Sequence, residues 1–255
     1  MTGRAIWKGT LGFKDVRVPV KLFAAVENRN IGFRLLHEPD RMPLKQRMIN
    51  PATEEPVEFD ETWRGVEVEP GHYVMLTEGE LDDLEPTPSR DIEVTRFVDP
   101  AEINHQWYDR PYYLGPDESD ASYYALARAL QSQAKEGVAR WVMRKKRYLG
   151  ALQAHGGHLM LITLRHEGEV VPASELEGPS GRALEKKERQ MAERFIAALE
   201  EDFEPELYRD EYRERVARLI EIKQKGGSVE PEEYEEKEAS DDLLELLEAS
   251  LEAVS

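Results

Sequence analysis

Residues 138–165 combine strand patterns with two tight turns, and this combination constrains the fold more than any other stretch of the chain. Apolar and polar residues alternate over 138–143, and the segment carries Trp141, a good strand former. A second strand is expected at 148–154. The turn at 155–157 then leads into a nearly continuous apolar run at 158–164, which is typical of a buried strand. The chain must therefore contain three consecutive strands joined by short turns.

Four consecutive cations, residues 144–147, occupy the first of these turns. They cannot be buried without partners, so they face water or a polyanion. The chain is acidic overall, with a net charge of −18, but its cations are concentrated in two blocks. The net charge is +6 over residues 1–50 and +7 over residues 121–165. Because local potential decides what a surface binds, a fold that joins these blocks would create one basic face on an acidic protein.

The N-terminal block has the alternation of a half-buried strand. Residues 4–23 predict two strands around a turn near 12–15, and the valines at 16, 18 and 20 alternate with Arg17, Pro19 and Lys21. Period two places the valines on a core face and the cations on the opposite face. Pro19 lacks a backbone donor, so we expect it at a sheet edge or a bulge. Further short strands are expected at 31–36, 73–77, 92–98 and 112–114.

Helical patterns appear in the middle of the chain and dominate its last third. Thr77 and Glu80 form a capping box for a short helix at 78–84. A second helix is expected at 121–136, ended by Gly137, with Tyr124, Ala127 and Leu130 along one face. Beyond a boundary at 177–181, amphipathic helices are expected at 182–201, at about 207–225 and at 241–254. This order predicts an α+β chain with an antiparallel β-barrel core and a C-terminal helical arm.

Four blocks of the sequence carry a family resemblance. They are RAIWKGTLGF…VRVPVKLF at 4–23, TRFVDPAEINHQWYDRPYYLGPD at 95–117, GVARWVMRKKRYLGALQ at 137–153, and FEPELYRDEYRERVARLIEIK at 203–223. In these blocks, in this order, the chain resembles the bacterial Ku family, homodimeric factors that bind DNA ends in non-homologous end joining. The resemblance covers about residues 4–225.

The resemblance implies a division into three parts. Residues 1–178 would form the barrel core, including an arch at about 44–69 that crosses over DNA. Residues 182–226 would form a helical arm for dimerisation, so that two chains make a ring. Residues 227–255 would form an acidic linker and a terminal amphipathic helix.

Candidate site residues follow from the charge and apolar patterns together with the resemblance. The cations expected to contact the phosphates of double-stranded DNA are Lys8, Lys14, Arg17, Lys21, Arg34, Lys45, Arg47, Arg140, Arg144, Lys145, Lys146 and Arg147. The residues expected in the dimer arm are Met191, Phe195, Leu199, Tyr208 and Tyr212. The residues expected to dock an ATP-dependent end-joining DNA ligase are Leu243, Leu244, Leu247 and Leu251, although packing of this helix on the chain's own arm is the alternative.

Two departures from the family pattern limit these expectations. Many relatives carry a Cys-x-x-Cys pair in the segment that corresponds to 48–56, whereas this chain contains no cysteine, so we expect no metal there. Many also end in a lysine-rich tail that aids DNA binding, whereas this tail is acidic and leucine-rich. We expect no cofactor and no catalytic residue. No apolar run suggests a secretory signal or a membrane span, so we expect a cytoplasmic, nucleoid-associated protein.

Two other function classes remain open at this stage. An acidic protein-interaction scaffold would explain the charge and the terminal helix but leaves both basic blocks unused. A Mg²⁺-dependent nuclease would need clustered carboxylates, and only the Glu-x-Lys triplets at 185–187 and 221–223 hint at one. The histidines His155, His158 and His166 are expected in surface or packing roles rather than as metal ligands. The sequence contains neither a phosphate-binding glycine loop nor a nucleophile elbow.

Overall fold

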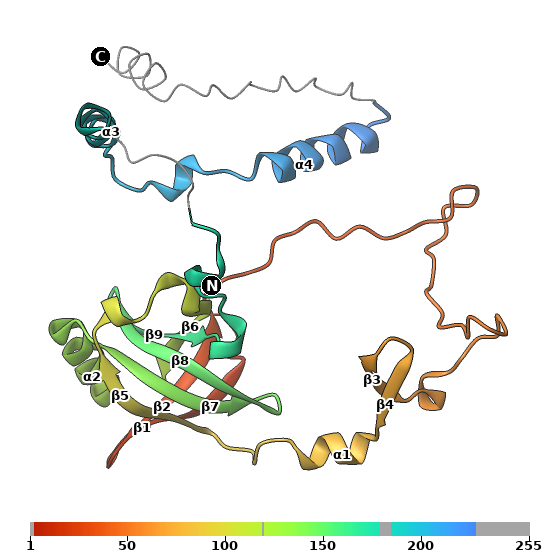
Figure 1. The fold of residues 1–255 in the computed structure, drawn as a ribbon, viewed down its shortest axis with the longest axis horizontal. Helices are drawn as coiled ribbons and strands as arrows, with labels where there is room; N and C mark the ends of the chain where they lie inside the picture. Colours follow the sequence, from red (N-terminus) through yellow and green to blue (C-terminus); the bar gives the residue numbers. More distant parts are fainter. Residues whose placement is uncertain (1–2, 119, 179–184, 228–255) are drawn as a thin grey trace. The chain divides into compact units, whose positions relative to one another are not determined.

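The computed structural model describes residues 3–118, 120–178 and 185–227 of the chain (Figure 1). The chain divides into two compact units. The first contains Met1–Arg29 and Phe33–Glu175, and the second contains Asn30–Gly32 and Leu176–Ser255. Among the described helices, none is both long and apolar enough to cross a membrane.

Seven strands of the first unit close into a barrel, in the order β1-β2-β6-β9-β8-β7-β5 (Figure 1). Neighbouring strands are antiparallel except where β1 pairs in parallel with β5 and closes the barrel. The α+β class and the barrel are therefore confirmed, with one parallel pair that the sequence did not indicate. The strands are β1 (Trp7–Phe13), β2 (Val16–Ala24), β5 (Asp91–Val98), β6 (Tyr108–Pro116), β7 (Glu136–Met143), β8 (Lys146–His155) and β9 (His158–Leu164).

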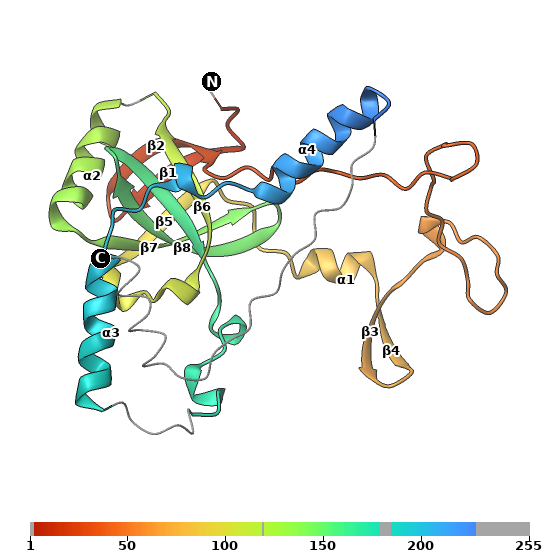
Figure 2. The ribbon, with the colours of Figure 1, turned by 90° about the horizontal axis from the view of Figure 1, so that it is seen from above.

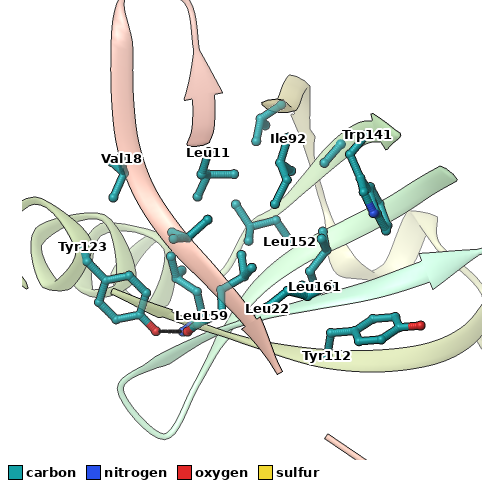
Figure 3. Close-up of a cluster of buried hydrophobic side chains, with 14 of the residues drawn as sticks. Leu11, Val18, Leu22, Ile92, Tyr112, Tyr123, Trp141, Leu152, Leu159 and Leu161 are labelled. Atoms are coloured by element: carbon teal, nitrogen blue, oxygen red, sulfur yellow. Dashed lines mark hydrogen bonds between the residues drawn. The ribbon is translucent and has the colours of Figure 1, made fainter. Parts of the chain in front are cut away.

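The barrel interior is filled by apolar side chains that alternate along each strand (Figure 3). The large aliphatic side chains on the strands that are at most 1% exposed are Leu11, Val18, Val20, Leu22, Ile92, Leu114, Leu152, Leu159 and Leu161. Each buried side chain of this size contributes about 1.5–3 kcal/mol relative to exposure. The predicted valine face is correct at positions 18 and 20 but wrong at Val16, which is 44% exposed because it adjoins the β1–β2 turn.

Pro19 does not lie on an edge strand, because β2 pairs with both β1 and β6. The pairing with β6 begins only at Val20, so Pro19 lies just outside that ladder. Its carbonyl accepts a hydrogen bond from the backbone N–H of Asp117 at 3.1 Å. The missing proline donor is therefore tolerated at the end of a ladder rather than at the edge of a sheet.

Helix α2 (Asp120–Gln133) packs against β8, β2, β6 and β9. Both views of the ribbon show it beside the barrel (Figures 1 and 2). It buries Tyr123, Ala127 and Leu130, so the expected face is correct except at Tyr124, which is 42% exposed. The Tyr123 hydroxyl donates to the Leu114 carbonyl and accepts from the Leu159 N–H, which ties the helix to two strands. The helix ends before Gly137, since Ala134 has a φ of 48° and β7 begins at Glu136.

The connection from β2 to β5 is long and exposed. Residues 25–63 contain no strand, and the strand expected at 31–36 is reduced to an isolated bridge between Leu36 and Pro43. The chain returns through a two-stranded hairpin, β3 (Arg64–Glu69) with β4 (His72–Leu76), and the short helix α1 (Glu78–Asp83). The capping box of Thr77 and Glu80 is present as predicted.

The second unit contains the helices α3 (Lys186–Ala198) and α4 (Glu211–Gln224), joined through a 3-10 turn at Pro205–Leu207. Both helices are shorter than their patterns suggested. Leu207 lies in the 3-10 turn, and Tyr208 follows that turn rather than lying on α4. Neither helix has a fully buried residue within this chain.

Candidate nucleic-acid interface

The two basic blocks meet on the outer face of the barrel. Inward apolar residues force their neighbours outward, so Arg17 of β2 and Arg140 of β7 point away from the core. Strand register then aligns Arg17 with Gly12, Gly12 with Glu93, and Glu93 with Arg140 across β2, β1, β5 and β7. Residues more than 120 positions apart in the sequence thereby lie in one row.

This row borders an open recess of about 610 Å³. Four of its lining residues are candidate cations from both blocks: Lys14, Arg17, Arg140 and Arg147. Asp91 and Glu93 line it as well, because β5 lies between the two blocks. We name this surface the basic face, defined by these four cations. Its shape is open and its walls are mostly polar, which suits an extended anionic chain better than a small enclosed ligand.

The four-cation run is only partly a turn. Met143 pairs with Lys146, so Arg144 and Lys145 alone form a two-residue turn, with φ of 50° and 64°. These values are those of the tight turns preferred in β-hairpins. Lys146 and Arg147 belong to β8, and all four side chains are exposed.

Four of the twelve candidate cations form ion pairs that the sequence did not predict. Lys8 and Lys21 both bind Asp117, at 3.3 and 2.6 Å, and Arg17 binds Asp91 at 3.0 Å. The hydrogen bond from Lys21 is the main cause of the lowered pKa of Asp117.

Lys145 is the fourth paired cation. Its Nζ lies 3.2 Å from Asp82 Oδ1 and 2.9 Å from Glu85 Oε1. Hydrogen bonds to Glu85 and then Asp82 raise its pKa. The paired cations are partly neutralised before any ligand arrives, whereas no carboxylate in the described part of the chain pairs with the other eight: Lys14, Arg34, Lys45, Arg47, Arg140, Arg144, Lys146 and Arg147.

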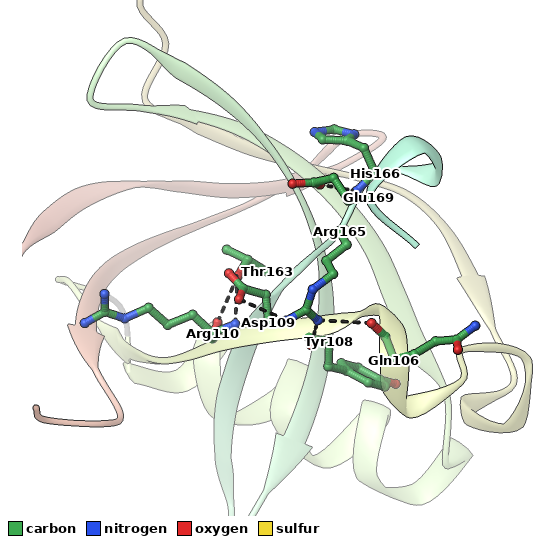
Figure 4. A network of polar contacts seen from close by, with 8 residues as sticks. All are labelled: Gln106, Tyr108, Asp109, Arg110, Thr163, Arg165, His166 and Glu169. Carbon is green, nitrogen blue, oxygen red and sulfur yellow. Dashed lines mark hydrogen bonds and ion pairs between the residues drawn. The ribbon is translucent and has the colours of Figure 1, made fainter. Parts of the chain in front are cut away.

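Two further cations of the second basic block have structural roles. The Arg165 guanidinium donates to the carbonyls of Gln106 and Tyr108 and forms an ion pair with Asp109 at 3.4 Å (Figure 4). Lys135 forms an ion pair with Asp99 at 3.0 Å. The positive charge of residues 121–165 is therefore only partly available to a ligand.

The remaining candidate cations, Arg34, Lys45 and Arg47, lie on the exposed segment between β2 and β3. Several large apolar side chains of the same segment are also exposed, among them Phe33 and Leu35, both at 72%. The segment 48–56 contains a turn in which the N–H of Glu54 donates to the Asn50 carbonyl at 2.8 Å. No group of three or more metal-ligating side chains occurs among the described residues.

The Glu-x-Lys triplets and the three histidines, which could have indicated a nuclease or a metal site, do not come together in one place. Glu185 is the N-cap of α3, and Glu221 lies within α4, so the Glu-x-Lys triplets are on helices. His155 and His158 oppose each other at the exposed β8–β9 turn. The backbone N–H of His166 donates to Glu169 in a short turn (Figure 4).

The helical unit presents apolar side chains to solvent. Of the residues expected in a dimer arm, Met191 and Phe195 are half-buried, whereas Leu199, Tyr208 and Tyr212 are exposed. Phe203, which the sequence analysis did not single out, is 77% exposed and stacks on Tyr208 at 5.4 Å. The expected ligase-docking residues, Leu243, Leu244, Leu247 and Leu251, lie outside the described residues.

Comparison with known proteins gives a consistent result. Residues 12–193 match the family model described as the Ku70/Ku80 beta-barrel domain. The chain is 39% identical to the Non-homologous end joining protein Ku 2 of Geotalea uraniireducens, over 100% of both chains. It is 38% identical to the Non-homologous end joining protein Ku of Anaeromyxobacter sp., over 89% of this chain and 77% of that protein. It is 35% identical to the protein of that name in Pseudomonas aeruginosa, over 97% of this chain and 88% of that protein.

Proposed function

The chain belongs to the Ku family, and we propose that it binds the ends of double-stranded DNA in non-homologous end joining, as a homodimeric ring that does not read base sequence. The proposal rests first on the basic face, where the barrel brings Lys14 and Arg17 to the same recess as Arg140 and Arg147. Contacts of arginine and lysine with phosphates give affinity without sequence preference.

The proposed division of the chain follows the expected boundaries. Residues 1–178 form the barrel core, and an arch at about 44–69 crosses over the DNA. Lys45 and Arg47 on the arch, with Arg34 just before it, are exposed and have no acidic partner in the described part of the chain. They are therefore available to phosphates on the side of the duplex away from the barrel.

The helical arm at 182–226 is proposed to hold two chains together. Tyr208 and Tyr212 are 72% and 68% exposed, and neither α3 nor α4 has a fully buried residue within one chain. Exposed apolar surface of this extent is typical of an interface, and a second copy of the chain is the partner we propose.

We further propose that the protein has no catalytic activity and that an ATP-dependent DNA ligase seals the ends that it holds. The acidic linker and terminal helix at 227–255 would recruit that ligase through Leu243, Leu244, Leu247 and Leu251. The acidic tail is repelled by DNA, which would leave the leucines available to a protein groove. Such a protein would act in the cytoplasm, on the nucleoid.

A gel shift with three forms of one duplex sequence tests the proposal: linear, closed circular, and linear with both ends blocked by large hairpin loops. A threaded ring shifts only the open linear form, and the shift should weaken steeply with salt. Equal shifts of the circular and linear forms would refute threading. Shortening of the DNA in Mg²⁺ would indicate a nuclease, and no shift of any form would favour a scaffold.

A further inference from the structure

We propose that Lys145 is not a phosphate contact but a positioning residue that fixes residues 78–90, the segment through which the chain returns from the proposed arch to β5, on the barrel. The inference concerns the ionic clip formed by Lys145 with Asp82 and Glu85, which lie 63 and 60 positions earlier in the chain. It rests on the proposed function in one respect, namely that the arch crosses the DNA.

The acidic side of the clip lies where the arch rejoins the barrel. Asp82 is in α1 and Glu85 follows its end, after which the chain enters β5 through Pro86 and Pro88. Helix α1 has no buried residue, and its capping box joins only Thr77 and Glu80 of the same segment. Apolar burial therefore does little to fix α1 on the barrel, and charge pairing becomes important.

The basic side of the clip is held rigidly. Lys145 occupies the second position of a two-residue turn, directly between the paired residues Met143 and Lys146. Met143 is 5% exposed and belongs to the barrel core. The base of the Lys145 side chain is therefore fixed to the core, and its ammonium can hold both carboxylates at once.

The two ion pairs give Lys145 a different role from the three neighbouring cations of the same run. Arg144, Lys146 and Arg147 have no acidic partner in the described part of the chain, whereas Lys145 has two. To bind a phosphate, it would have to give up both carboxylates and leave them exposed beside the anionic ligand, which opposes binding. Within the run of four cations, we therefore assign three to the ligand and one to the arch.

Carbodiimide cross-linking of the full wild-type chain tests the contact directly, because this reagent joins only an amine and a carboxylate that touch. We expect a Lys145–Glu85 or Lys145–Asp82 product by mass spectrometry, both without DNA and with a linear duplex bound. Absence of the product from the free chain would refute the clip. Its loss when DNA binds would assign Lys145 to phosphate instead.

Salt titrations of duplex binding separate the two roles. Lys145→Gln should weaken binding about 3- to 10-fold, the scale of two exposed ion pairs, with an unchanged dependence of log affinity on log salt. The matched variant Lys146→Gln should lower that slope by about 1.8, which is about 0.9 for each chain of the proposed ring. The charge-neutral swap Lys145→Glu with Glu85→Lys should restore most of the affinity lost in Lys145→Gln.

A slope reduced by about 1.8 in Lys145→Gln, an affinity equal to wild type, or a swap that binds no better than Lys145→Gln would each overturn the proposal. If the wild-type chain binds no DNA at all, the proposed function fails. The cross-link still decides independently whether the clip exists.

Discussion

Removing two unpaired cations from the basic face should change how DNA binding depends on salt. Arg140 and Arg147 line the same recess, and neither has an acidic partner in the described part of the chain. If each contacts one phosphate, the double variant Arg140→Gln/Arg147→Gln releases two fewer counterions per chain. Because the proposed ring contains two chains, four fewer counterions are released per ring, and the slope of log affinity against log salt should fall by about 3.6.

The size of the effect follows from this slope. Raising salt from 50 to 200 mM is a fourfold change, so a slope difference of about 3.6 corresponds to a factor of about 150 in affinity. That factor equals about 3 kcal/mol at 25 °C. Wild type should lose about 150-fold more affinity than the variant over this range. Fluorescence anisotropy with a short linear duplex of fixed sequence would measure it.

A control in the same recess separates net charge from the loss of side chains. Arg17→Gln/Asp91→Asn removes an ion pair of 3.0 Å and leaves the net charge unchanged. Its slope should match wild type, since Arg17 is already neutralised by its partner. The reasoning would be refuted if the Arg140/Arg147 variant kept the wild-type slope, or if the control lost as much slope as the variant.

Three other predictions follow from the arm, the tail and the barrel core. Tyr212→Asp on the exposed face of α4 should shift the protein from dimer to monomer in sedimentation at micromolar concentration. A dimer of unchanged affinity would contradict the proposed role of the arm in dimerisation. Leu244→Asp/Leu247→Asp should abolish ligase stimulation and keep end binding, whereas unchanged stimulation would refute docking. Burial raises the pKa of Glu136, so a protonated Glu136 stabilises the folded state. This contribution to the free energy of unfolding is present at low pH and is lost as pH rises through the folded-state pKa. The melting temperature of wild type should therefore fall relative to Glu136→Gln between pH 4 and pH 8, and parallel curves would contradict this.

The barrel could be predicted because its signals are local. The stretch 138–165 forms β7, β8 and β9, since alternation and turn chemistry depend on neighbouring residues only. The strand expected at 31–36 failed for the opposite reason. Most of its residues apart from Arg34 are apolar, but a strand needs a partner, and the structure offers this segment only the bridge between Leu36 and Pro43.

The ion pairs of the candidate site could not be predicted by the same means. Lys8 and Lys21 meet Asp117 because β2 pairs with β6, and Lys145 meets Asp82 across 63 positions of sequence. No local pattern distinguishes a cation that will be paired from one that will not. Counting cations in a block therefore overstates the charge available to a ligand, and only strand order and register identify the free ones.

Strand order also explains why acidic residues lie within the basic face. The barrel closes by inserting β5 between β1 and β7, and β5 contributes Asp91 and Glu93 to the recess. With neighbouring strands about 4.8 Å apart, Arg17 on β2 and Arg140 on β7 are three spacings, or about 14 Å, from each other. A phosphate is repelled by Glu93 at the centre of this row and attracted by Arg140 beside it, whereas Arg17 is neutralised by Asp91. The acidic strand thus limits how deeply a DNA backbone settles at any one position, and weak, evenly spread contacts are what a ring needs if it is to move inward from a DNA end.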